Sequence, residues 1–282
     1  MAPHLPHPHV AHSDGSEDLL LSLGRLVDVA LSQLELQRVR VELAAALQRH
    51  MLPCALPDQA PVGLRFAARY VPSQDGLNVG GDWYDIFSLP DGSLVFAIGD
   101  VQGHDMDAIA LMGQFRVGLR SAAEATTDPG EVLAHTNELL LAMDCSRFAT
   151  CSFLRFDPFT GELSASRAGH LPVAWADADG RSGAAFDECG PPLGVVADAR
   201  YPVTRRWLAE EGVLLLVTDG VVEGPCFPIE QGMKRVLELV RAGCRGDPDV
   251  LADQVLQVAD LTGHRDDAAL LVIHHARLAA AG

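Results

Sequence analysis

Residues 79–105 read VGGDWYDIFSLPDGSLVFAIGDVQGHD and predict a β-hairpin. Two apolar runs, residues 83–89 and 93–98, flank the tripeptide Pro90-Asp91-Gly92. This tripeptide favours a turn, because proline presets φ and glycine accepts positive φ. The hairpin therefore has a defined centre, and the register of its two arms can be counted outward from it.

That register brings two glycine-flanked aspartates, Asp82 and Asp100, to the open end of the hairpin. They lie the same number of residues from Asp91, so antiparallel pairing places them opposite or diagonal, with Cβ atoms roughly 4.5–8 Å apart. Like charges at this separation are unfavourable unless a cation lies between them. No lysine or arginine occurs between Val71 and Arg116. Two interpretations follow, a bound metal ion or two solvated turn residues.

The composition limits the classes of function. The chain has 282 residues, enough for one large or two small domains, and 48% of them are hydrophobic. Its formal net charge of −17 argues against nucleic acid or an anionic membrane as the main partner. The six cysteines form no C-x-x-C pair, which favours reduced thiols over a zinc site. With no apolar span and no signal-peptide pattern in the sequence, we expect a cytoplasmic protein.

The chain is predicted to have four parts. Residues 1–15 are a Pro/His-rich, disordered tail, residues 16–56 a helix and linker, residues 57–276 the main domain, and residues 277–282 a short tail.

The predicted N-terminal helix begins at Ser16 and extends to about His50. Apolar residues recur seven apart within it, at Leu20, Val27, Leu34 and Val41. This pattern fits either a dimeric coiled coil or an amphipathic helix packed on its own domain.

The main domain is predicted to mix hairpins with grouped helices. Helices are expected over residues 106–124, 129–143, 230–242 and 248–261, and strands over 149–156, 162–168, around Trp175, 213–217 and 268–274. This order indicates an α+β sandwich rather than a doubly wound parallel sheet.

Further aspartates stand at the ends of buried strands. The run VLLLVTDG ends in Asp219 and Gly220, and Asp266 and Asp267 precede the run AALLVI. Because sheets bring strand ends to one rim, we expect these carboxylates to meet Asp82 and Asp100. Oxygen ligands without Cys or His favour Mg²⁺ or Mn²⁺. Several carboxylates can hold two such ions, lower the pKa of a bridging water and orient a phosphoryl group, which is the chemistry of phosphate-ester hydrolysis.

Eight short motifs carry a resemblance to a known family. In order they are LQRHMLP, VGGDWYD, IGDVQGH, ALMGQFR, AGHLP, GPPLG, VTDGVVE and DDAALLV. From about Leu47 onward the chain resembles the bacterial metal-dependent serine/threonine phosphatases of the PP2C-like SpoIIE/RsbU type. The resemblance implies an α/β/β/α sandwich, here with an N-terminal helical extension.

The resemblance also implies a set of metal ligands. Asp100 would bridge two ions, either Mn²⁺ or Mg²⁺. Asp82 and the backbone carbonyl of Val101 would complete one ion's site, and Asp219 and Asp266 would complete the other.

Other residues are assigned roles beside the ions. His104, in the family's GH element, joins the two hairpin aspartates as an expected catalytic residue, and His170 is expected in the wall of the site. Asp267 is expected to contact the ligands rather than an ion.

Two positions depart from the family pattern. Asp105 replaces a glycine, so it would carry backbone strain if φ is positive there, or else add a further carboxylate beside the site. Arg167 replaces an asparagine, and would either approach the phosphate or be a surface strand residue.

The implied activity is a cytoplasmic protein serine/threonine phosphatase in which a metal-activated water attacks phosphorus directly. The implied substrate is a phosphorylated signalling protein such as an anti-sigma-factor antagonist, with a homodimer through the N-terminal helix as a further expectation. One alternative is a phosphatase-like binding module with weak or no turnover. Another is hydrolysis of a small phosphorylated metabolite.

Overall fold

The computed structural model describes residues 22–35, 38, 63–72, 80–103, 105–143, 146–185, 188–208, 210–225, 227–263 and 266–276. The chain divides into two compact units, Met1–Leu43 and Ala44–Gly282. In the first unit, residues 22–35 form a helix, in agreement with the predicted N-terminal helix. The rest of this first unit, apart from residue 38, lies outside the described residues, as do both predicted tails.

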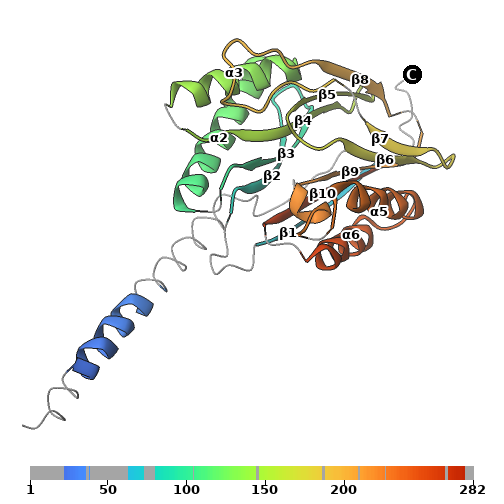
Figure 1. Ribbon diagram of the computed structural model, residues 1–282. Helices are drawn as coiled ribbons and strands as arrows, with labels where there is room; N and C mark the ends of the chain where they lie inside the picture. Colours follow the sequence, from blue (N-terminus) through green and yellow to red (C-terminus); the bar gives the residue numbers. More distant parts are fainter. Residues whose placement is uncertain are drawn as a thin grey trace, which may run out of the picture. The chain divides into compact units, whose positions relative to one another are not determined.

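The second unit contains two five-stranded sheets in which every strand pairing is antiparallel (Figure 1). The first sheet has the order β1 (Leu64–Val71), β10 (Ala268–His275), β9 (Gly212–Val217), β6 (Val173–Asp177) and β7 (Ser182–Ala185). The second sheet has the order β2 (Asp82–Ser88), β3 (Leu94–Val101), β4 (Ala149–Asp157), β5 (Glu162–Ala168) and β8 (Val203–Trp207).

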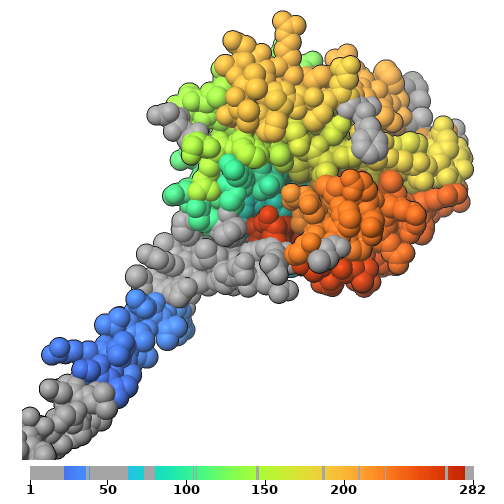
Figure 2. All heavy atoms as spheres, in the orientation of Figure 1, coloured from blue at the N-terminus to red at the C-terminus, as the bar shows by residue number. Residues whose placement is uncertain are grey.

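Helices cover the outer face of each sheet. The pair α2 (Met106–Ala125) and α3 (Pro129–Ala142) packs on the second sheet, and the pair α5 (Ile229–Ala242) and α6 (Pro248–Thr262) packs on the first (Figure 1). A single helical turn, α4 (Asp219–Val222), follows β9. In the space-filling view the two helix pairs form separate surfaces, green for α2 and α3 and orange to red for α5 and α6 (Figure 2). The predicted α/β/β/α sandwich is confirmed.

Three apolar layers hold the sandwich together. The inner layer lies between the sheets and includes Phe96 and Leu271. The second lies under α2 and α3, where the rings of Trp83 and Phe115 are 5.0 Å apart. The third lies under α5 and α6. Because each sheet buries both faces, β9 and β10 are almost continuously apolar instead of alternating.

The predicted hairpin is β2 and β3, paired so that Asp82 lies directly opposite Asp100. At its turn, the Asp91 carboxylate accepts hydrogen bonds from the backbone N–H and the hydroxyl of Ser93. Gly92 has a φ of +84°, the conformation for which the turn requires glycine.

A buried carboxylate connects this hairpin to α2. Asp85 on β2 is 0% exposed. Its carboxylate accepts hydrogen bonds from Arg120 Nη2 at 2.6 Å and Nε at 2.8 Å, and pairs with Arg116 Nη2 at 3.1 Å. The Arg120 guanidinium also lies 4.4 Å from the centre of the Phe87 ring.

No helix among the described residues combines the length and the apolarity needed to cross a bilayer.

Candidate metal centre

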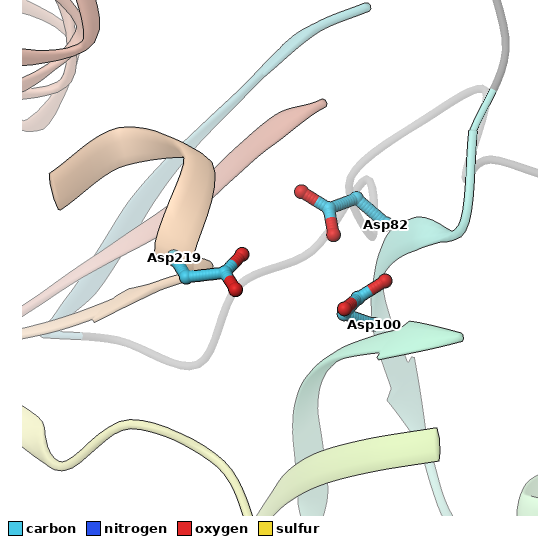
Figure 3. Close-up of side chains that lie close together, drawn as sticks. All are labelled: Asp82, Asp100 and Asp219. Atoms are coloured by element: carbon cyan, nitrogen blue, oxygen red, sulfur yellow. The ribbon is translucent and has the colours of Figure 1, made fainter. Parts of the chain in front are cut away.

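Three strand ends bring carboxylates together at one end of the sandwich. Asp82 begins β2, Asp100 lies near the end of β3, and Asp219 directly follows β9 and Thr218. One oxygen from each carboxylate lies within 4.8 Å of the other two, and the three side chains point toward one another (Figure 3). Asp82 and Asp100 belong to one sheet and β9 to the other, so the cluster forms only when the sheets pack.

Burial and mutual repulsion both oppose ionisation of this cluster. Burial is the largest cause of a raised pKa at each of the three aspartates. The second cause is repulsion by a neighbouring carboxylate, which also raises the pKa. Asp100 has this effect on Asp82, Asp219 on Asp100, and Asp266 on Asp219. The pKa of Asp100 rises to about 7, while that of Asp82 rises despite a hydrogen bond from Thr218. A cation among these oxygens would remove both penalties.

Glycines beside the aspartates leave room for oxygen atoms. A Cβ on Gly81 would lie 2.0 Å from the Val101 carbonyl oxygen and 2.9 Å from Asp100 Oδ1. A Cβ on Gly80 would lie 1.0 Å from Asp267 Oδ2, and one on Gly220 would lie 1.9 Å from the Asp267 carbonyl oxygen. The glycines in VGGD and TDG thus allow backbone and carboxylate oxygens to crowd into one small volume.

This donor set fits the hard divalent cations expected from the sequence. Carboxylate and carbonyl oxygens are the ligands that Mg²⁺ and Mn²⁺ prefer. The predicted ligands Asp82, Asp100 and Asp219 are brought together, and the Val101 carbonyl lies next to Asp100. Asp266 is exposed and outside the three-carboxylate group, yet it is near enough to raise the pKa of Asp100 and of Asp219. Its role as a ligand stays a prediction.

The two predicted histidines differ in what the structure describes. His104 lies outside the described residues. His170 is buried, and its Nδ1 is 2.8 Å from the hydroxyl of Thr150, a residue paired with Asp100 across β3 and β4. Burial lowers the pKa of His170 to about 4, so its ring is neutral at pH 7. A neutral buried ring fits the expected place in the wall of the site.

Asp105 adopts a conformation that argues against strain. Its φ is −98°, and the positive φ in this segment belongs to Gly103, at +102°. Asp105 is the N-cap of α2 and accepts a hydrogen bond from Ala108 N–H at 3.0 Å. Its other oxygen pairs with Arg147 Nη2 at 2.6 Å. Strain at position 105 was expected only if φ were positive there, and the negative φ excludes that alternative, because the chain reaches the helix through an ordinary N-cap. The other alternative, a further carboxylate beside the site, stays a prediction.

The alternative that Arg167 is a surface strand residue is also wrong. The residue is 9% exposed, and its Nη1 donates a hydrogen bond to the His170 carbonyl at 2.8 Å. Its guanidinium stabilises the AGHLP segment from within the fold.

Sequence reasoning missed three polar residues around the carboxylates. The Thr218 hydroxyl is 2.6 Å from Asp82 Oδ2, and Tyr70 accepts a hydrogen bond from Gly80 N–H at 3.1 Å. The third residue is Thr150, which pairs with Asp100 across β3 and β4 and contacts His170 through its hydroxyl. Only Thr218 carried a signal, because it directly precedes Asp219 at the end of the β9 run.

The two-sheet sandwich and its carboxylate cluster define a domain with the PP2C fold. The chain belongs to the SpoIIE family, since residues 90–276 match the family described as Stage II sporulation protein E (SpoIIE). It is 27% identical over 260 residues to Protein IcfG of Synechocystis, covering 81% of this chain and 39% of that protein. It is 25% identical over 221 residues to the phosphoserine phosphatase RsbU of Bacillus subtilis, covering 73% of this chain and 64% of RsbU. The matches thus span about two fifths to two thirds of these relatives.

Solved structures agree with this placement. The RsbU and RsbW domains of Rv1364c from Mycobacterium tuberculosis match with a TM-score of 0.68 and 30% identity, over 77% of this chain and 61% of that one. The SiaA PP2C domain of Pseudomonas aeruginosa matches with a TM-score of 0.71 over 87% of this chain and 99% of that one. At 19% identity, the second match concerns the fold alone.

Proposed function

We propose that this chain is a Mn²⁺- or Mg²⁺-dependent protein phosphatase that hydrolyses phosphoserine or phosphothreonine. The observation that carries the proposal is the convergence of Asp82, Asp100 and Asp219, with oxygens within 4.8 Å of one another, in a SpoIIE-family domain. Similarity to the phosphoserine phosphatases RsbU and RsbP of Bacillus subtilis supports the substrate chemistry.

The protein's own residues would act mainly by position and charge. Asp100 would hold two ions and Asp82 and Asp219 one each, with the Val101 carbonyl and Asp266 completing the ligand set and His104 beside them. When bound, the ions supply a water of lowered pKa and neutralise charge on the phosphoryl group. The carboxylates would act as ligands rather than as nucleophiles, so the proposal includes no phosphoenzyme.

Among the described cysteines, none favours a route through a cysteine nucleophile. Burial raises the pKa of Cys151 and of Cys244, so neither thiol is activated. Cys189 is exposed, but its sulfur lies beside the backbone of Arg167 and Gly190.

The substrate is proposed to be a phosphorylated partner protein. The relatives RsbU and RsbP are named as phosphoserine phosphatases, and the family resemblance favours an anti-sigma-factor antagonist. The three described free cysteines are consistent with the proposed cytoplasmic location.

A metal titration tests the activity. The full chain, freed of metal with chelator, should release phosphate from a phosphoserine peptide only after Mn²⁺ or Mg²⁺ is added back. Preference for the peptide over small phosphorylated metabolites would support a protein substrate, and the reverse preference would assign the metabolite alternative. Metal binding without any turnover would instead support the binding-module alternative.

We also propose a homodimer through the N-terminal helix. Leu23, Val27 and Leu34 are 50%, 52% and 63% exposed in the helix of residues 22–35, and Val27 and Leu34 lie seven apart on one face. Light scattering on the full chain should give a dimer mass, and Leu34→Glu should give a monomer. A monomeric wild-type chain at tens of micromolar would contradict the dimer.

A further inference from the structure

We propose that Arg147 and Asp105 form a clamp that positions the metal-binding end of β3, so that both act as positioning residues for metal affinity. The inference rests on the proposed metal site and goes beyond it, because neither residue is one of the proposed ligands. Position 105 is also where the chain departs from the glycine of the family pattern.

Arg147 holds the segment after Asp100 at two points. Its Nη1 donates a hydrogen bond to the Gln102 carbonyl at 2.8 Å, and its Nη2 pairs with Asp105 Oδ2 at 2.6 Å. Between these contacts the guanidinium lies against Gly103, where a Cβ would come within 2.2 Å of Nη1. A side chain at position 103 would therefore displace the guanidinium, and the positive φ of Gly103 already favours glycine.

Asp105 uses both carboxylate oxygens. Oδ1 accepts the Ala108 N–H at the start of α2, and Oδ2 takes the guanidinium of Arg147. The Ala108 N–H, followed by Arg147, lowers the pKa of Asp105 below its ordinary value. A glycine at position 105 would lack both contacts. The Asp105 side chain therefore links the start of α2 to the segment before β4.

The connection reaches the proposed ligands through the backbone. Arg147 lies two residues before Ala149, which begins β4 and pairs with Val101. The Gln102 N–H donates to the Phe148 carbonyl at 3.0 Å, and the Val101 N–H donates to the Gly81 carbonyl at 3.1 Å. The side chain of Arg147 and the backbone at Phe148 thus hold Gln102 from both its N–H and its carbonyl. The Val101 carbonyl belongs to the same planar peptide group as the Gln102 N–H. The two contacts therefore fix the direction of this carbonyl, whose oxygen is one of the proposed ligand atoms.

The chain offers a matched control at the other end of the same hairpin. Arg155 pairs with Asp91 at the turn, and the exposures of the two side chains, 17% and 44%, resemble the 25% and 54% of Arg147 and Asp105. Loss of either arginine removes one partly exposed ion pair with aspartate. Only Arg147 touches the segment that contains Val101.

Mn²⁺ titration calorimetry on the full-length metal-free chain tests the clamp. Residues that orient ligands typically change metal affinity by about 10–100-fold when removed, so Arg147→Met should weaken Mn²⁺ binding by about 10-fold or more. Arg147→Lys keeps the charge but not the two-point contact, and should fall between Arg147→Met and wild type. Arg155→Met should bind Mn²⁺ as wild type does. Asp105→Gly should also weaken binding.

The expected kinetic signature is a higher Mn²⁺ concentration for half-maximal hydrolysis by Arg147→Met, with kcat at saturating Mn²⁺ retained. Equal Mn²⁺ affinity in wild type, Arg147→Met and Arg147→Lys would overturn the clamp. If Arg147→Met fails the circular-dichroism check for folding, Arg147→Lys decides alone. If Arg147→Met binds Mn²⁺ more weakly than wild type but wild type hydrolyses no substrate, the clamp is supported and the proposed phosphatase activity is contradicted. The two claims therefore fail separately.

Discussion

Asp82 and Asp219 of the carboxylate cluster lie directly beside glycines. Gly80 and Gly81 precede Asp82, and Gly220 follows Asp219. All three glycines lie where a Cβ would overlap an oxygen atom. Close approach of backbone to a ligand is a recurring use of glycine, and here several oxygen atoms converge in the same way. The glycines are therefore part of the proposed metal centre, although they supply no ligand atom.

Gly81→Ala tests this role at the residue scale. A Cβ at position 81 would overlap the Val101 carbonyl oxygen at 2.0 Å, so either that oxygen or β2 must move. We expect Mn²⁺ affinity, measured by calorimetry, to fall by about 10-fold or more.

Gly183→Ala is the matched control for that substitution. Its new Cβ would find its nearest neighbour at 3.5 Å, and no change in Mn²⁺ affinity is expected. Wild-type affinity in Gly81→Ala would show that the close approach is not needed for binding.

The sequence predicted the acidic residues of the site better than their partners. Asp82 and Asp100 followed from turn chemistry, because the central Pro90-Asp91-Gly92 sets the register of both arms. Tyr70 could not be predicted, because it contacts Gly80 only when β1 and the start of β2 meet through the packing of the two sheets. The conformation at Asp105 was left open, because a motif does not reveal that an aspartate serves as the helix N-cap in place of glycine.

At the scale of elements, α2 is coupled to the hairpin through Asp85. This carboxylate is fully buried and pairs with both Arg116 and Arg120. Removing one side of a buried ion pair leaves the other charge uncompensated and typically costs about 3–5 kcal/mol. We expect Asp85→Ala to lower the free energy of unfolding by about that amount, measured by urea denaturation.

Glu238→Ala is a useful comparison, because Glu238 pairs with Arg235 on the exposed face of α5. A surface pair of this kind contributes about 0–1 kcal/mol. An equal, small effect of the two substitutions would show that Asp85 does not stabilise the contact between α2 and the hairpin.

Most elements were predicted from their patterns, and two of the exceptions share a physical cause. The helix capped by Asp128 and Pro129 and the one capped by Asp247 and Pro248 begin where expected. The edge strands β1 (LRFAARYV), β7 (SGAA) and β8 (VTRRW) and the single turn α4 were not predicted. An edge strand pairs on one side only, and β7 and β8 have few apolar residues, so their pairing comes from neighbouring strands rather than from local propensity.

At the scale of the whole molecule, the candidate site belongs to neither sheet alone. The second sheet contributes Asp82 and Asp100, and the strand end before Asp219 comes from the first. The inner apolar layer between the sheets therefore has a functional consequence, because it brings mutually repelling carboxylates together. The favourable burial of that layer offsets the cost of the cluster, and a bound cation would offset it further.

The most direct test of the account is phosphate release from a phosphoserine peptide by wild type and Asp100→Asn, at saturating Mn²⁺. Asparagine keeps the shape of the side chain but removes the charge proposed to hold both ions. Metal ions supply several kcal/mol to such reactions, so the rate should fall by about 100-fold or more, while the metal-free variant unfolds at or above the wild-type temperature. Undiminished phosphate release by a folded Asp100→Asn chain would contradict the account.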